Sequence, residues 1–398
     1  MKKGWQTKKL SEFYQIGSSK RVLKSQWKAE GVPFYRGREV TRLAADGFVE
    51  NELFVSEKHF AELAKQYGVP KAGDIVITAI GTIGNSHVVR DSDRFYFKDA
   101  SVLWMKRVTD ISSEFINFWL KSPHFFDQLD RGNGATVDTL TIQKLQSVGL
   151  LIPPLPEQHR IVGILDEAFA GLATAKANAA KNLHNARALF DSHLQSVFSQ
   201  RGKGWIDTKL GEVCGFQNGF AFKSNSFKES GEPILRISNI QDGQFDSRRL
   251  VFFNPKDYRE NLDRYKVLKG DLLIAMSGGT TGKIGFNTED TVFYLNQRVG
   301  KFEPGKNLDK RYLYYFLSTK VEENLKISAG SAQPNLSTEQ IKGFVLPLPA
   351  IDEQRRIVAT WDALNAETTR LAAIYQQKLA ALEALKKSLL HQAFSGEL

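Results

Sequence analysis

The chain carries the same series of short motifs twice, and this internal repeat limits its fold more than any other feature. The segment Gly73-Asp74-Ile75-Val76-Ile77 in the first half returns as Gly270-Asp271-Leu272-Leu273-Ile274 in the second half. Further pairs recur in the same order: Gly4-Trp5 with Gly204-Trp205, Pro33 with Pro233, Glu157-Gln158 with Glu353-Gln354, and Phe198-Ser199 with Phe394-Ser395. Chance does not keep several pairs in one order, so we interpret the sequence as two copies of one module.

Each copy begins with a segment that has the composition of a globular domain. Residues 1–150 and 204–346 are rich in glycine, aromatic residues and short β-type runs, and short helical patterns occur at Phe115–Leu120 and Arg311–Leu317. Glycines that follow apolar runs, such as Gly81 after Ile75–Ile80, are typical of turns between strands. We therefore expect two similar mixed α+β domains, each large enough for its own core.

Each copy ends with a segment that predicts one long helix. Residues 151–203 and 347–398 open with prolines, which suit a first helical turn, and Glu157 and Glu353 follow where carboxylates stabilise a helix N-terminus. Apolar residues then recur at alternating spacings of about three and four residues, the pattern of a coiled-coil seam. The seam consists of Ile161, Leu165, Leu172 and Leu183 in the first copy, and of Ile357, Trp361, Leu364, Leu371, Leu382, Leu385 and Leu389 in the second. We expect the two helices to pair with each other; two ordinary core helices are the alternative.

The composition predicts a water-soluble, cytoplasmic protein. Hydrophobic residues make up 42% and charged residues 25% of the 398 residues, which allows packed cores. The single cysteine, Cys214, cannot form an internal disulfide and favours a reducing compartment. The apolar run Ile75–Ile80 is far shorter than the roughly 18 residues that cross a bilayer, and the polar residues after Met1-Lys2-Lys3 do not continue a signal peptide.

The net charge of +10 favours an acidic partner. Most of this excess lies in the two globular segments, whereas the helical segments have no basic amphipathic face, so nucleic acid is favoured over a membrane surface. Arginine can bind guanine edges, asparagine and glutamine adenine edges, and lysine mostly phosphate. The candidate DNA-binding residues are Lys20, Arg21, Lys24, Arg36, Arg38, Lys223, Ser224, Arg236, Asn239, Lys283, Asn296, Gln297 and Arg298. Arg36 and Arg236 occupy the same repeat position and fit a scaffold role equally well.

The residues do not point to catalysis by this chain. Gly278–Gly285 resembles a phosphate-binding loop, but three residues instead of four separate Gly278 from Gly282, and Ile284 stands at the Mg²⁺-binding position. The histidines lack metal-ligand spacing, and one cysteine cannot form a zinc cage. We therefore expect no catalytic residue, no metal and no cofactor in this chain.

The doubled order of motifs resembles the DNA-specificity subunit of type I restriction–modification systems, and the resemblance covers essentially the whole chain. It rests on the two Gly-Asp segments, on Leu295–Arg298 and Gly330–Ser337, and on the proline-Glu-Gln starts of the helical segments at Pro154–Ile161 and Pro347–Ile357. The first copy departs from the pattern, because Lys98-Asp99-Ala100-Ser101 stands where the second has Asn296-Gln297-Arg298.

This resemblance implies a non-catalytic subunit in which two target-recognition domains are separated by two long antiparallel helices, with an internal pseudo-two-fold repeat. Residues 1–150 and 204–346 would each read one half of a bipartite, asymmetric target in double-stranded DNA. Residues 151–203 and 347–398 would be the central and distal conserved helical regions, which form a coiled coil, set the spacer and dock two modification subunits. S-adenosylmethionine would bind to the modification subunits, and ATP and Mg²⁺ would bind to restriction subunits.

Two other functions fit parts of the sequence. A DNA methyltransferase or nuclease with unrecognised motifs would modify or cut DNA as the purified chain alone, which a specificity subunit would not do. A coiled-coil scaffold that binds proteins through its globular domains would show no salt-sensitive, sequence-selective DNA binding. The target site itself is not predictable from the sequence, because readout depends on which side chains reach which base edges.

Overall fold

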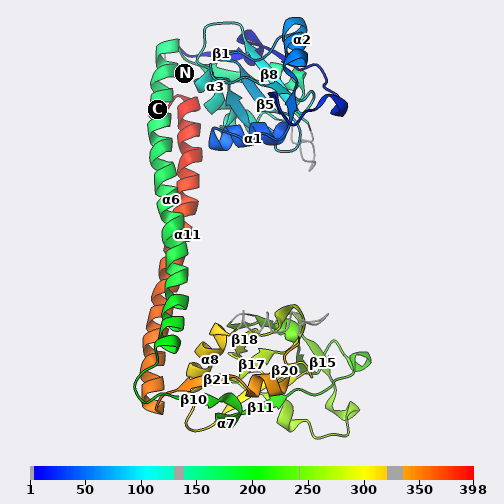
Figure 1. Ribbon diagram of the computed structural model, residues 1–398, viewed down its shortest axis with the longest axis vertical. Helices are drawn as coiled ribbons and strands as arrows, with labels where there is room; N and C mark the ends of the chain where they lie inside the picture. Colours follow the sequence, from blue (N-terminus) through cyan, green and yellow to red (C-terminus); the bar gives the residue numbers. More distant parts are fainter. Residues whose placement is uncertain (1–3, 130–138, 242, 321–334) are drawn as a thin grey trace. The chain divides into compact units, whose positions relative to one another are not determined.

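The computed structural model describes residues 4–129, 139–241, 243–320 and 335–398, and the chain divides into two compact units (Figure 1). Unit 1 contains residues 1–180 and 376–398, and unit 2 contains residues 181–375. Each unit combines one globular domain, called domain 1 (residues 4–152) or domain 2 (residues 206–348), with one part of each long helix, α6 (Leu155–Gln200) and α11 (Ile351–Ser395). The Gly330–Pro334 part of the motif Gly330–Ser337 lies outside the described residues.

Domain 1 is built on two small sheets and one strand pair. The first sheet is antiparallel with the order β2-β8-β5-β6, the second has the order β4-β3-β7 with β3 parallel to β7, and β1 pairs with β9. The strands are β1 (Gln6–Lys9), β2 (Tyr14–Ser18), β3 (Val32–Tyr35), β4 (Phe54–Val55), β5 (Ile75–Thr78), β6 (Ser86–Val88), β7 (Tyr96–Phe97), β8 (Val102–Arg107) and β9 (Gly149–Ile152). The helices are η1 (Leu10–Glu12), η2 (Lys24–Gln26), α1 (Gly37–Asp46), α2 (Glu57–Tyr67), α3 (Ser113–Leu120), α4 (Pro123–Phe126) and α5 (Ile142–Ser147).

Domain 2 repeats this topology. Its first sheet has the order β11-β20-β17-β18, its second has the order β15-β12-β19-β16 with β12 parallel to β19, and β10 pairs with β21 and β13 with β14. The strands are β10 (Ile206–Lys209), β11 (Cys214–Asn218), β12 (Glu232–Leu235), β13 (Ile240–Gln241), β14 (Gln244–Phe245), β15 (Val251–Phe253), β16 (Lys266–Val267), β17 (Leu272–Ala275), β18 (Ile284–Phe286), β19 (Phe293–Leu295), β20 (Val299–Pro304) and β21 (Val345–Leu348). The helices are α7 (Leu210–Val213), η3 (Ser224–Ser226), η4 (Ile237–Asn239), η5 (Ser247–Arg249), η6 (Pro255–Asp257), η7 (Asp263–Tyr265), η8 (Gly278–Thr280), α8 (Lys310–Thr319) and α10 (Thr338–Lys342). The matching strand orders confirm the two mixed α+β domains predicted from the repeat.

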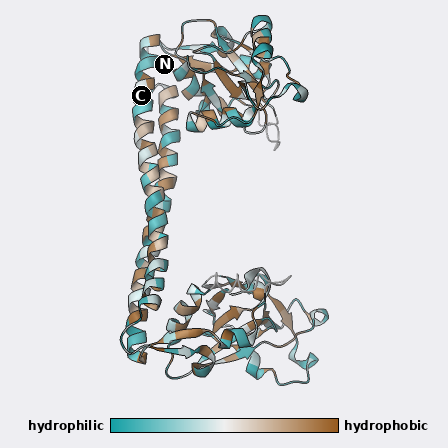
Figure 2. Ribbon diagram, in the orientation of Figure 1, coloured by the Kyte–Doolittle hydropathy of each residue, from teal (hydrophilic) through white to brown (hydrophobic). Residues whose placement is uncertain are grey.

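The central strand of each domain is apolar throughout because it is buried on both faces. In β5, Ile75 and Ile77 belong to the core that includes α3, whereas Val76 faces the core that includes α1. In β17, Leu272 and Ile274 pack with α8, whereas Leu273 faces β19. Figure 2 shows strands coloured toward the hydrophobic end in the interior of both domains. A strand covered on both faces gains burial at every position, which explains why no polar alternation marks it in the sequence.

The repeated Gly-Asp motif forms the turn that starts this strand. Gly73 and Gly270 both have φ of +84°, a left-handed conformation that glycine adopts without steric cost. The buried Asp74 carboxylate accepts hydrogen bonds from Lys71 N, Trp104 Nε1 and Arg107 N, each at 2.9 Å. Its counterpart Asp271 accepts one from the backbone N–H of the residue three positions before it. The motif is therefore a structural element of the fold.

A buried glutamine ties the start of each long helix to its domain. Gln158 Oε1 accepts a hydrogen bond from Ser112 N (3.0 Å), at the N-terminus of α3, and its Nε2 donates to Pro153 O (2.9 Å). In domain 2, Gln354 Oε1 accepts from Asp309 N (2.8 Å), at the N-terminus of α8. The repeated Glu-Gln motif thus fixes the same helix–domain junction twice.

A phenylalanine anchors the other end of each long helix. Phe394, near the end of α11, packs on Phe115 of domain 1 with ring centroids 5.1 Å apart. Phe198, near the end of α6, lies 5.5 Å from the Tyr312 ring of domain 2. Each domain therefore packs against the beginning of one long helix and the end of the other.

Inside each unit the two long helices run antiparallel. In unit 1, Arg160 donates to the Leu398 carbonyl (2.9 Å), and further along α6 Lys176 forms an ion pair with Glu383. In unit 2, Phe198 packs on Trp361, and the earlier residues Phe190 and Leu194 of α6 line a cavity with Asn365 of α11. Within the described residues, none of the helices combines the length and the apolar composition that crossing a bilayer requires.

Most of the predicted seam residues face into the helix pair or its domain. Ile161, Leu165 and Trp361 are buried, and the half-buried residues are Leu172, Leu183, Ile357, Leu364, Leu371, Leu382 and Leu389. Leu385 differs from the prediction, since it is 47% exposed. An α-helix turns about 20° per heptad away from a 3.5-residue repeat, and Leu390 and Ala393 take the buried positions at this end of α11.

Candidate nucleic-acid interface

Three loops of domain 1 meet beyond the C-terminal end of β5. Ala79 N donates a hydrogen bond to Ser101 O (3.0 Å), and Ala100 N donates to Ser18 Oγ (3.1 Å). Arg21, whose side chain is 71% exposed, pairs with Asp99 through Nε and Oδ2 at 2.9 Å. The loop after β2, the residues after β5 and the loop before β8 therefore form one edge of the domain.

A groove of about 410 Å³ lies between these loops, and we call it groove 1. Its lining includes three cationic residues, Arg21, Lys24 and Lys98, and three large apolar ones, Leu23, Trp27 and Ile80. Sequence reasoning selected Arg21 and Lys24 and also Lys20, an exposed lysine whose Nζ lies 5.7 Å from the centroid of the Tyr67 ring. It missed Lys98, although that residue occupies the repeat position of the predicted Asn296.

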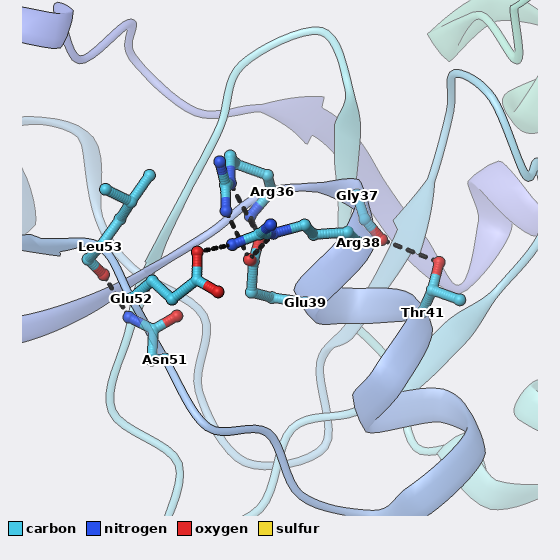
Figure 3. A network of polar contacts seen from close by, with 8 residues as sticks. All are labelled: Arg36, Gly37, Arg38, Glu39, Thr41, Asn51, Glu52 and Leu53. Atoms are coloured by element: carbon cyan, nitrogen blue, oxygen red, sulfur yellow. Dashed lines mark hydrogen bonds and ion pairs between the residues drawn. The ribbon is translucent and has the colours of Figure 1, made fainter. Parts of the chain in front are cut away.

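Arg36 and Arg38 are held by carboxylates at the start of α1 (Figure 3). Arg36 binds Glu39 through its backbone N (2.8 Å), Nε (3.1 Å) and Nη2 (2.7 Å), and Arg38 pairs with both Glu39 and Glu52. Burial would raise the pKa of the Glu39 carboxyl, which is 3% exposed, but the hydrogen bonds from Arg36 and Arg38 outweigh it and keep this pKa below its ordinary value. Two arginines and two carboxylates cancel in charge, so this network shapes the edge more than it attracts an anion.

Domain 2 builds the same edge from the equivalent loops. Asn296 N donates to Leu235 O (2.9 Å), and Met276 N donates to Arg298 O (2.9 Å). The Arg298 side chain reaches Asn335 Oδ1 through Nη1 at 3.3 Å. Asn296 is half-buried, whereas Gln297 and Arg298 are exposed, so the predicted segment lies on the surface of the domain.

The remaining predicted residues of domain 2 belong to the segments that follow β11 and β17. Lys223 and Ser224 are exposed at the start of η3, the counterpart of η2. Lys283 is half-buried, and its Nζ lies 3.4 Å from Gln241 Oε1. The glycine-rich segment before it joins the antiparallel strands β17 and β18 and does not lead into a helix, unlike a phosphate-binding loop.

Asn239 does not fit the predicted DNA contact, because it is only 1% exposed and its side chain holds the surrounding loop. Its Oδ1 accepts from Arg236 N (3.0 Å), and its Nδ2 donates to Asp246 O (2.8 Å). Asn239 occupies the position that Glu39 has in domain 1, where a carboxylate caps Arg36 N in the same way. Arg236, whose Nη2 contacts Arg249 O at 3.3 Å, likewise belongs partly to this scaffold.

The single cysteine is a buried residue of domain 2. The buried Cys214 thiol has its pKa raised to about 11, mainly by burial, so it is a protonated packing group at neutral pH. Within residues 4–129, 139–241, 243–320 and 335–398, the structure contains no group of three or more His, Cys, Asp and Glu side chains placed to hold a metal ion. The two edges offer instead exposed cations, amides and apolar side chains, the groups that contact phosphates and base edges.

Comparison with known proteins agrees with the repeat. The family model described as the type I restriction modification DNA specificity domain matches residues 2–182 and, a second time, residues 202–384. The MjaVIII type I restriction enzyme specificity subunit of Methanocaldococcus jannaschii is 26% identical over 272 residues, which cover 64% of this chain and 63% of the relative. The EcoBI specificity subunit of Escherichia coli is 26% identical over 299 residues, which cover 67% of this chain and 62% of the relative. The matched stretches thus span less than two thirds of these relatives.

Two solved structures share the fold over the whole chain. One, from work on complex assembly and conformational transition of the type I R-M system, has a TM-score of 0.79 at 19% identity and covers 100% of this chain and 99% of its own. The HsdS subunit from Thermoanaerobacter tengcongensis has a TM-score of 0.64 at 18% identity, covering 100% and 98%. With two family matches that together span most of its length, the chain belongs to the family of type I restriction modification DNA specificity domain proteins.

Proposed function

We propose that this chain is the DNA-recognition subunit of a type I restriction–modification complex, in which each domain reads one half of a bipartite, asymmetric target. The observation that carries the proposal is the pair of equivalent edges, which are built on the same strand order but differ in loop length and in side chains. The loop before β8 presents Lys98, whereas the loop before β20 presents Asn296, Gln297 and Arg298. Two copies of one framework with different surface residues suit two unlike half-sites, and joining them raises specificity over a single short site.

The long helices are proposed to set the spacer between the half-sites. α6 is one continuous helix of 46 residues and α11 one of 45, and each is tied to both domains by the Gln and Phe anchors described above. At 1.5 Å per residue, each helix is about 70 Å long, which exceeds the roughly 35 Å of one duplex turn. A helix pair of this length can hold two reading surfaces at a set distance along DNA.

The same proposal assigns the chemistry to partner subunits. Two modification subunits, which dock on the helices, would bind S-adenosylmethionine, and restriction subunits would use ATP and Mg²⁺, so this chain would be a non-catalytic subunit without a cofactor. The exposed basic residues on the solvent side of the helices, such as Arg355 and Lys387, are available for such docking.

Methylome sequencing of a host that expresses this chain with its modification subunits tests the proposal. We expect methylated adenines in one asymmetric motif, with two short specified parts and an unspecified spacer of constant length. A continuous or palindromic motif, or methylation that does not depend on this chain, would contradict it. The purified chain alone should neither methylate nor cut the same DNA.

A further inference from the structure

One surface position of the edge that carries groove 1 differs in character between the domains, although it precedes an equivalent short helix in both. Leu23 directly precedes η2 and Lys223 directly precedes η3, so the two residues are equivalent. Their buried neighbours keep an apolar character, since Val22 and Phe222 are both 6% exposed. Leu23 itself is 57% exposed. The change from leucine to lysine therefore alters what the surface can bind and not how the domain packs.

A second position on the same edge shows the same contrast. Ile80 forms an antiparallel bridge with Thr139, and Ser277 forms the equivalent bridge with Asn335. Ile80 follows the buried Ala79, as Ser277 follows the buried Met276, and Ile80 is 46% exposed. Domain 1 thus presents an aliphatic side chain where domain 2 presents a hydroxyl.

Both aliphatic side chains line groove 1 together with Arg21, Lys24 and Lys98. Asp99 also lines the groove and pairs with Arg21, so Lys24 and Lys98 supply the excess positive charge. A groove with apolar side chains and cations at its border fits a negatively charged ligand that places an apolar group in the groove. In the major groove of duplex DNA that group is the 5-methyl of thymine, since the other base edges present hydrogen-bond donors and acceptors. Cations at the border of the groove are placed to meet the phosphates on either side.

We propose that Leu23 and Ile80 are specificity-determining residues of domain 1, which read a thymine through its 5-methyl group in groove 1. This inference rests on the proposed function and adds to it the base and the chemical group that are recognised. It also predicts an asymmetry, because domain 2 has Lys223 and Ser277 at these positions and lacks the apolar pair.

Deoxyuridine removes this methyl group and leaves the base pairing unchanged, so it is the matched probe. The full chain, assembled with its modification subunits, is titrated with duplexes of the methylome-derived target in which each thymine of the specified parts is replaced in turn. We expect one replacement in the half-site of domain 1 to weaken binding about four-fold, the effect of one buried methyl group. In the double variant L23A/I80A, the thymine duplex should bind more weakly, and the difference between thymine and deoxyuridine should disappear.

Val108→Ala is the control, because Val108 is 54% exposed but lies beside Phe13 at the opposite end of β8. This variant should keep the full thymine preference. The inference is overturned if no thymine replacement changes the affinity, or if L23A/I80A keeps the preference, while salt-dependent binding to the target persists. If the complex without any substitution does not bind the target, the proposed function itself is overturned.

Discussion

Replacement of Gln354 by alanine tests how firmly the long helices are joined to the domains. The side chain is 0% exposed, its Oε1 accepts from Asp309 N (2.8 Å), and its Nε2 donates to Asn307 O (3.0 Å) and Pro349 O (2.8 Å). Each bond contributes about 1 kcal/mol net, and truncation also leaves buried backbone groups without a partner. We therefore expect Gln354→Ala to lower the free energy of unfolding of unit 2 by about 3 kcal/mol.

Calorimetry of the full chain measures this effect, because a destabilised unit 2 is expected to unfold in a transition of its own, below that of unit 1. For a unit of this size, 1 kcal/mol corresponds to about 2–4 °C, so the transition of unit 2 should fall by about 6–12 °C. Gln377, an exposed residue of the same helix, provides the control, and Gln377→Ala should leave both transitions in place. If the transition temperature of unit 2 in Gln354→Ala stays within one or two degrees of the original, Gln354 does not stabilise the junction between α11 and domain 2. Gln158→Ala should lower the transition temperature of unit 1 instead.

Three further outcomes follow from the two recognition edges. The pKa of Glu39 lies below its ordinary value of 4.5, so the ionised carboxylate stabilises domain 1 above that pH, and this stabilisation is lost as the pH falls through the folded pKa. Glu39→Gln should remove this part of the pH dependence of stability, as measured by denaturant titrations. An unchanged pH dependence would count against the Arg36–Glu39–Arg38 network. Asn239→Ala should cost about 1–3 kcal/mol of stability and leave the methylated motif unchanged, whereas an altered motif would restore Asn239 as a reader. Arg298→Ala should weaken binding of the assembled complex to its target about ten-fold through the half-site of domain 2 alone, and equal affinities would exclude a DNA contact.

The repeat, the helices and the central strands were predictable because they leave periodic signals. The apolar stripe predicted α6 and α11, and the Gly-Asp segments predicted the start of β5 and β17. Leu385 shows the limit of this reasoning, since a stripe drawn with a constant heptad spacing drifts away from the buried face of a real helix.

The recognition residues were less predictable, because residue type does not reveal a side chain's partner. Asn239 and Arg36 have the chemistry of base readers, yet both are held by their neighbours. Asn239 is buried and bonded to the backbone of Arg236 and Asp246, and Arg36 is bonded to Glu39 of α1. Ile80 has the chemistry of a core residue, yet it is exposed because β5 ends before it. Only the tertiary arrangement of the loops separates these roles.

The proposed role of the helices as a spacer is tested most directly by shortening them. Removing four residues from each helix beside the Lys176–Glu383 ion pair shortens it by slightly more than one turn, or about 6 Å, which corresponds to one or two base pairs at about 3.4 Å each. Methylome sequencing of a host with this variant should show the same two half-sites separated by a spacer that is one or two base pairs shorter. An unchanged spacer, or altered half-sites, would contradict the account.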